Sequence, residues 1–348
     1  MEPDSSTKFF VVSGEHPTLP IAELRAILNS QPVEFKITRT EFKLVKVQAD
    51  HMKPEEVAWR AGLTEEAGIE IFESSPEEED IARMLMSSRL DGLLSPNEGF
   101  SVRVARFGGA SRSLSRTKLE PFLGDLLVKK TRGRVDLRAP TKLFRGIITG
   151  KEFCFGLQTY RRPPGSIGNR RPRKRPAFHP STMVPKLARC MVNLSQPIPG
   201  AVFMDPFCGV GGIALEACLL GYQVLGVDAV KRMLRGARRN LAHFGVSPLG
   251  LIRGDARRIP VSGVEAIATD PPYGTGASTL KSTTRQILND FLPRAREILS
   301  PGARTVIASP VGTDCLGLAE KNGFELLDRH LVYVHRSLTR EILVLGAP

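Results

Sequence analysis

The sequence predicts an α/β protein in which a doubly wound, largely parallel sheet follows two smaller units of mixed helix and strand. Three observations predict this fold. Strand and helix patterns alternate after residue 178. The elements before that point are short and mixed in type. The length of 348 residues suits two domains, or three small ones, at roughly 150 residues per domain.

Residues 1–95 contain the elements of a first small α+β unit. The segments 9–12 and 42–47 are expected to be strands, and apolar residues recur at helical spacing over 21–28. A second helix follows the acidic run at 77–80, because negative side chains stabilise the start of a helix. We therefore expect an independent N-terminal domain over these residues.

Residues 96–160 form the second small unit. Strands are expected at 102–104, 135–137 and 153–157, around a helix over 119–127. No internal repeat is visible in this part of the chain.

Residues 161–177 are expected to be a basic linker. The stretch from 161 to 175 contains seven basic and no acidic residues, together with three prolines and two glycines. This composition is typical of a segment between domains.

The remaining residues, 178–348, show the alternation of a doubly wound sheet with an antiparallel hairpin at its end. Helices are expected at 181–194, 213–220, 231–244 and 286–299. Strands are expected at 201–204, 223–227, 249–252, 264–269, 304–308, 325–334 and 341–345.

The positive charge is concentrated in the middle of the chain. The net charge is +13, and residues 101–175 contain 20 basic and only 4 acidic residues. A basic block of this kind favours a polyphosphate partner such as a nucleic acid, although a solvated spacer stays an equal alternative. The candidate RNA-binding residues are Arg161, Arg162, Arg170, Arg171, Arg173, Lys174 and Arg175.

Acidic residues follow three successive expected strands. Asp205 opens a glycine-rich turn with the sequence DPFCGVGG, Asp228 ends the next strand, and Asp255 follows the third. Glycines let a backbone approach a ligand closely, and an acid at the second strand end can accept both hydroxyls of a ribose. The turn is not G-x-G-x-x-G, and an initial aspartate suits an ammonium and a sulfonium better than a pyrophosphate. These features predict a site for S-adenosylmethionine, although a plain tight turn is also compatible with the glycines alone.

The tetrad Asp270, Pro271, Pro272 and Tyr273 follows a fourth expected strand. The lone pair of an exocyclic base amine is delocalised into the ring, so the amine is a poor nucleophile. Hydrogen bonds from its two N–H groups to the Asp270 carboxylate and the Pro271 carbonyl would favour a pyramidal nitrogen with a directed lone pair. Tyr273 is expected to stack on the base. This chemistry predicts an amino-methyltransferase that needs neither a metal nor a catalytic cysteine.

With these motifs, the chain resembles archaeal tRNA guanosine-10 N2-methyltransferases. The resemblance rests on FHPSTMVPKLARCMVNL (178–194), DPFCGVGG, the Asp228 strand end, DPPYG and VHRSLTR (334–340), and extends more weakly over the rest of the chain. It implies a ferredoxin-like domain, a THUMP RNA-binding domain and a Rossmann-like class I methyltransferase domain that acts on tRNA. The cofactor-binding residues implied by the family pattern are Thr182, Asp205, Phe207, Gly209, Asp228, Asp255, Ala256 and Asp270.

Several alternatives stay open at the level of sequence. The same tetrad would serve methylation of another tRNA guanosine, at position 6, or of a DNA adenine or cytosine. A non-catalytic RNA-binding protein is less favoured because all the acidic strand ends are present. His335 and Arg336 either line the target pocket or form a hairpin turn, and residues 274–282 form either a lid or an ordinary loop.

Composition also limits the class of protein. Five cysteines without C-x-x-C spacing argue against a disulfide framework and a zinc cluster, and no stretch approaches the roughly 20 apolar residues of a membrane span. No secretory signal is apparent at the start of the chain. We therefore expect a cytoplasmic protein without metal, membrane association or an obligate protein partner.

Overall fold

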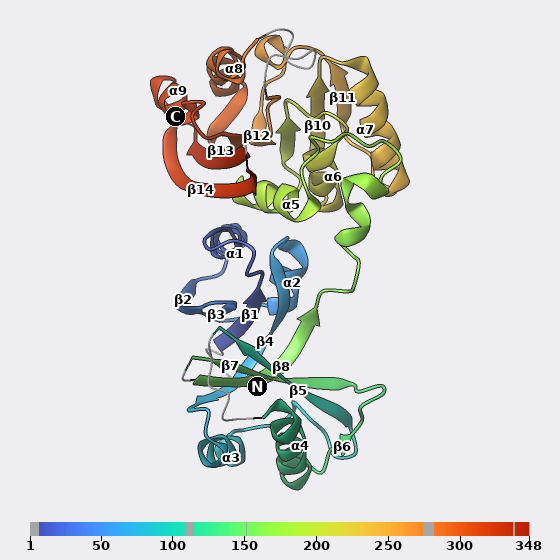
Figure 1. The fold of residues 1–348 in the computed structure, drawn as a ribbon, viewed down its shortest axis with the longest axis vertical. Coiled ribbons are helices and arrows are strands. Elements are labelled where there is room, and N and C mark those ends of the chain that lie inside the picture. Colours follow the sequence, from blue (N-terminus) through green and yellow to red (C-terminus); the bar gives the residue numbers. More distant parts are fainter. Residues whose placement is uncertain (1–6, 109–114, 151, 274–281, 337, 348) are drawn as a thin grey trace. The chain divides into compact units, whose positions relative to one another are not determined.

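A computed structural model describes residues 7–108, 115–150, 152–273, 282–336 and 338–347 of the chain (Figure 1). Its contacts divide the chain into two compact units. The first consists of residues up to 15, 32–59 and 64–163, and the second of residues 16–31, 60–63 and 164–348.

One mixed sheet organises the first unit. Its strands are β1 (Thr7–Val12), β2 (Phe35–Glu41), β3 (Leu44–Ala49), β4 (Thr64–Ser74), β5 (Gly99–Phe107), β6 (Arg134–Val135), β7 (Lys142–Thr149) and β8 (Glu152–Arg161). They lie in the order β2-β3-β1-β4-β8-β7-β5-β6. The antiparallel pairing of β4 with β8 joins strands from either side of residue 95, where the sequence predicts a domain boundary.

Helices and aromatic side chains build the core of this unit. Its helices are α2 (Pro54–Arg60), whose last residue falls outside the unit, α3 (Glu78–Ser87) and α4 (Arg116–Thr131). The first turn of α3 is acidic, as expected. Buried residues of α3 and α4 pack with Phe100, Phe144 and Phe155 of the sheet. Aromatic side chains of this size each bury a large apolar area.

The second unit contains the predicted doubly wound sheet. Its strands are β9 (Val202–Asp205), β10 (Gln223–Asp228), β11 (Gly250–Arg253), β12 (Val264–Thr269), β13 (Leu299–Pro310), β14 (Glu325–His335) and β15 (Leu338–Gly346). The order is β11-β10-β9-β12-β13-β15-β14, with β9 to β13 parallel and the β14–β15 hairpin antiparallel. The order of the strands reverses between β9 and β12, which is where open α/β sheets bind ligands.

Helices cover both faces of this sheet. They are α1 (Leu19–Asn29), α5 (Pro185–Leu194), α6 (Gly212–Leu219), α7 (Lys231–His243), α8 (Thr284–Ile298) and α9 (Cys315–Lys321), with 3₁₀ turns η1 (Gly168–Arg170), η2 (Pro172–Lys174) and η3 (Ala256–Arg258). Phe203 packs on one face with α5 and α6, whereas the adjacent Met204 packs on the other with α8 and α9. This alternation makes β9 a strand with two apolar faces, so it occupies the centre of the sheet.

The basic segment 161–177 is more ordered than its composition suggests. Residues 164–177 cluster with the second unit and contain η1 and η2, and Ile167 is buried. Elsewhere, β2, β4, β7, α2 and α9 are elements that the sequence patterns did not indicate.

Among the described residues, no helix has both the length and the apolar character needed to cross a membrane.

Candidate active site

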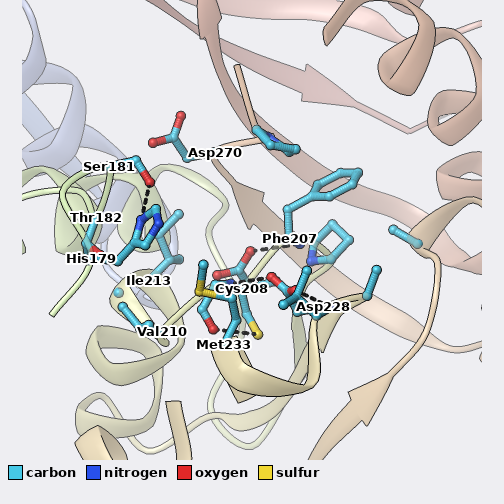
Figure 2. A pocket seen from close by; sticks show the side chains of 18 of the residues that line it. His179, Ser181, Thr182, Phe207, Cys208, Val210, Ile213, Asp228, Met233 and Asp270 are labelled. Carbon is cyan, nitrogen blue, oxygen red and sulfur yellow. Dashed lines mark hydrogen bonds between the residues drawn. The ribbon is translucent and has the colours of Figure 1, made fainter. Parts of the chain in front are cut away.

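A pocket lies at the carboxyl edge of the second unit's parallel strands (Figure 2). Its lining includes the acids that end or follow four neighbouring strands: Asp205 at the end of β9, Asp228 at the end of β10, Asp255 after β11 and Asp270 after β12. All eight residues that the sequence predicts for cofactor binding line this one pocket, including Thr182, which comes from the segment before α5. Parallel strands bring their carboxyl ends to the same edge, which explains why acids up to 65 positions apart converge here.

The glycine-rich turn between β9 and α6 forms the floor of the pocket. Gly209 and Gly211 adopt φ values of 52° and 79°, a left-handed conformation that favours glycine. A Cβ atom at Gly212 would lie 3.0 Å from Cγ2 of Thr182, so a larger residue there would crowd the pocket wall. These glycines leave room for a ligand against the main chain.

Asp228 binds the main chain of this turn through hydrogen bonds. Its Oδ2 accepts a hydrogen bond from the Gly209 N–H at 3.0 Å, and its Oδ1 accepts one from the Val230 N–H at 2.8 Å. Burial raises the pKa of this carboxyl group. Each oxygen keeps a further lone pair, so the carboxylate can still accept ribose hydroxyls.

Asp205 is the most deeply buried acid of the site, with an exposed fraction of 1%. The Thr269 hydroxyl donates to its Oδ1 at 2.9 Å, and the Phe207 N–H donates to the same oxygen at 3.3 Å. Burial raises its pKa to about 7, against the opposing effect of these donors. A cationic ligand group in the pocket would favour the ionised form of this carboxylate.

Asp255 is already engaged by another residue. Nε and Nη2 of Arg257 donate to its carboxylate, the latter at 2.6 Å, and the Arg257 main-chain N–H donates at 3.1 Å. These bonds lower its pKa. The carboxylate lines the pocket, but Arg257 occupies much of its acceptor capacity.

Asp270 forms a small buried network with Tyr273 and Arg340. The Tyr273 hydroxyl donates to Oδ1 of Asp270, and Nη2 of Arg340 donates to Oδ2 at 3.1 Å. Nε of Arg340 also donates to the Tyr273 hydroxyl at 3.1 Å. Burial raises the pKa of Asp270 to about 6, and the adjacent guanidinium opposes that rise.

Only two of the four residues of the predicted tetrad line the pocket. Asp270 and Pro272 line the pocket, whereas Pro271 and Tyr273 are not part of its lining. Tyr273, which is expected to stack on a base, uses its hydroxyl to orient Asp270 and lies with its ring centroid 5.6 Å from the guanidinium carbon of Arg340. The possible lid at 274–282 falls outside the described residues, apart from its last residue.

Arg340 is the site residue that the sequence reasoning missed. It lies in β15, within the VHRSLTR motif. His335 and Arg336 are the residues of this motif that were predicted as candidates, and both are exposed. Arg340 is only 8% exposed and stands near the start of β15, shortly before the buried apolar residues of that strand. A buried arginine at the start of an apolar strand is the signal that indicates a carboxylate partner.

The candidate RNA-binding residues separate into two groups. Arg161, Arg171, Arg173 and Lys174 are exposed. The others make internal contacts. Arg162 donates to the Thr64 and Ala58 carbonyls, Arg170 pairs with Glu216, and Arg175 is only 5% exposed. In this structure, Arg170 and Arg175 are therefore not available to bind phosphates at the surface.

All five cysteines are free and buried. Within the described part of the chain, no three His, Cys, Asp or Glu side chains are grouped so that they could hold a metal ion.

Comparison with known proteins identifies the family of the chain. Residues 172–342 match the UPF0020 family model, described as an RMKL-like methyltransferase domain. The chain is also similar over its whole length to the crystal structure of TrmN from Thermus thermophilus, with a TM-score of 0.56, 24% identity, and coverage of 98% of this chain and 100% of that one. This likeness supports the fold: a mixed N-terminal sheet followed by a Rossmann-like methyltransferase sheet.

Relatives found by sequence indicate the reaction class as well as the fold. The tRNA (guanine(6)-N2)-methyltransferase of Thermus thermophilus is 30% identical over 60% of this chain and 61% of its own length. The tRNA (guanine(10)-N2)-dimethyltransferase of Pyrococcus abyssi is 29% identical over 97% of this chain and 99% of its own. The protein of the same name from Methanothermobacter thermautotrophicus is 35% identical over 96% and 98%, respectively. The chain therefore belongs to the tRNA (guanine(10)-N2)-dimethyltransferase family.

Proposed function

We propose that this protein transfers methyl groups from S-adenosylmethionine to the exocyclic N2 of guanosine 10 in tRNA, in two rounds that give dimethylguanosine. The observation that carries the proposal is the Asp270 carboxylate, which is enclosed at the end of β12 and lines the pocket together with Asp205 and Asp228. The relatives in the family support the nucleoside and its position.

The residues of the pocket fit S-adenosylmethionine. Asp228, at the end of β10, would accept the ribose hydroxyls, and Asp205 would face the ammonium group. The left-handed glycines of the turn leave the space that the cofactor requires. When bound, the cofactor supplies an electrophilic methyl group on a sulfonium.

Asp270 and Pro271 would activate the guanine amine. An ionised carboxylate has about four lone-pair sites, so Asp270 can accept an N–H of the base while it binds Tyr273 and Arg340. The Pro271 carbonyl would accept the second N–H. Methyl transfer leaves the nitrogen with a surplus proton, and a carboxylate with a pKa of about 6 is suited to accept it.

The N-terminal parts of the chain would select the RNA. We assign residues 1–95 to a ferredoxin-like domain, 96–160 to a THUMP domain, and 161–177 to a basic connection. The exposed residues Arg161, Arg171, Arg173 and Lys174 would contact tRNA phosphates. A paired guanosine must leave its stack to enter the pocket, which costs a few kcal/mol.

The test is methylation of transcribed tRNA followed by mass mapping of its nucleosides. We expect N2-methylguanosine and then N2,N2-dimethylguanosine at position 10, and no product when position 10 is adenosine. A relative is named as a guanosine-6 methyltransferase, so that position is the second candidate. The assay therefore includes a transcript with guanosine at position 6 and adenosine at position 10, and a duplex DNA. Product at position 6 alone, or only on duplex DNA, would overturn the assignment.

Asp270→Ala tests the chemical role in the same assay. We expect the rate of methyl transfer to fall by about a hundredfold or more, because the amine loses its oriented acceptor. Binding of tRNA, measured by filter retention, should change little. Full activity in this variant would contradict the proposed role of Asp270.

A further inference from the structure

Arg175 lies in the second unit, and its guanidinium group has hydrogen-bond donors without an acceptor. It follows η2 and is only 5% exposed. Its Nε donates to the Arg170 carbonyl at 2.7 Å, whereas its Nη1 and Nη2 are buried without a hydrogen-bond partner. Leaving charged donors unsatisfied in this way is costly, so such an arrangement is expected where a ligand completes it.

The carboxylate of Glu216 interacts electrostatically with Arg175, but it already binds two other arginines. Arg170 donates to its two oxygens at 2.7 and 2.9 Å, and Nη1 of Arg189 donates at 3.2 Å. Glu216 is fully buried. Arg175 therefore adds a positive charge beside a carboxylate that already pairs with two other arginines, and burial lowers the pKa of this arginine. A buried excess of positive charge favours an incoming anion.

The unused donors lie beside the proposed cofactor pocket. Residue 212 is a glycine, and the position that a Cβ atom would take there serves as a reference point. Nη1 of Arg175 lies 3.7 Å from this position, and Cγ2 of Thr182 lies 3.0 Å from it. Gly212 and Thr182 both line the pocket, and Gly212 begins α6, whose free N–H groups also favour an anion. Figure 2 shows Thr182 and Ile213 on the opposite side of Cys208 from Asp228.

We propose that Arg175 binds the carboxylate of the amino-acid end of S-adenosylmethionine, an inference that rests on the proposed function. If Asp228 binds the ribose of the cofactor, the amino-acid end of the cofactor extends toward Thr182. Its carboxylate would there supply the acceptors that the Nη groups of Arg175 lack. The two Nη groups match the two oxygens of a carboxylate. A tRNA phosphate is the less suitable anion, because the guanidinium is enclosed while the neighbouring basic residues are exposed.

The test compares two ligands by calorimetry: S-adenosylmethionine and its decarboxylated form, which keeps the ammonium and sulfonium groups. We expect the intact protein to bind the first at least about tenfold more tightly, as a charged hydrogen-bonded pair contributes. Arg175→Met keeps an apolar stem but no donors, and should reduce this ratio to about twofold or less. Arg175→Lys keeps a point charge and should give an intermediate ratio.

Arg170→Met is the matched control. It removes a neighbouring buried arginine whose contacts go to Glu216, so it should change the affinity for both ligands by the same factor. Equal affinities of the intact protein for the two ligands would overturn the inference without any variant. So would an unchanged ratio in Arg175→Met or Arg175→Lys, or a loss of tRNA binding alone. Failure of the intact protein to bind S-adenosylmethionine would instead refute the proposed function.

Discussion

Replacing Arg340 by leucine should shift the pH dependence of methyl transfer toward higher pH. Nη2 of Arg340 lies 3.1 Å from Oδ2 of Asp270, and the exposed fractions of the two side chains are 10% and 14%. The guanidinium is the main group that opposes the effect of burial on the Asp270 pKa, which stands at about 6. Without it, the carboxyl group will hold its proton to a higher pH.

The size of the shift follows from the geometry. An adjacent arginine lowers the pKa of an aspartate by about 1–3 units, so the Asp270 pKa in Arg340→Leu should be about 7–9. At pH 7 the ionised fraction would fall from about nine-tenths to between about one-half and one-hundredth. The value of kcat/KM at pH 7 should therefore fall by about 2- to 100-fold, and should recover as the pH approaches about 9.

The assay is kcat/KM for methyl transfer between pH 5 and 9, with thermal unfolding followed at each pH. Arg340→Lys keeps a charge and should show a smaller shift, and Arg329→Leu removes an arginine of the same hairpin that pairs with Glu341 rather than Asp270. A folded Arg340→Leu protein that loses the same factor at every pH would refute the electrostatic reasoning. A wild-type profile without an acidic limb near pH 6 would refute it as well.

Two further predictions follow from the site and its surroundings. Asp205→Asn should weaken binding of S-adenosylmethionine by about 10- to 100-fold in calorimetry. The pKa of Asp205 in the folded protein is raised to about 7, so ionisation of this residue destabilises the fold at pH values above its pKa in the unfolded chain. The free energy of unfolding of Asp205→Asn, relative to that of the intact protein, should therefore rise by up to about 1.4 kcal/mol per pH unit between about pH 4 and 7. A difference that stays constant with pH would contradict this. Changing the exposed residues Arg171, Arg173 and Lys174 to alanine should weaken tRNA binding and flatten its salt dependence without altering cofactor affinity; unchanged retention of tRNA on filters across salt concentrations would show that they do not contact RNA.

Strand β4 shows why part of the first unit could not be predicted from local pattern. Its sequence, TEEAGIEIFES, is rich in acids and lacks clean alternation. The acids are accommodated because basic side chains reach them from β3 and β7, each across one intervening strand: Arg145 lies 2.7 Å from Glu66, and Lys46 lies 2.5 Å from Glu70. Such cross-strand pairs stabilise a sheet, but they depend on residues remote in sequence.

The sequence alone predicted which residues come together at the candidate pocket. Asp205, Asp228, Asp255 and Asp270 each follow a recognisable strand, and the parallel sheet brings the carboxyl ends of such strands to one edge, where all four line the pocket. Periodicity and strand-end residues are local signals, so they can be read without knowing which distant segments meet.

Only the tertiary structure decided which charged side chains pair with one another. Arg340 meets Asp270 across 70 positions of the chain, and Arg170 meets Glu216 across 46, while Arg175 is enclosed beside the pocket. A dense run of arginines is the same pattern whether its members face solvent or the protein interior. The difference is set by the packing of remote elements around them, which determines whether a charge is solvated, paired or left for a ligand.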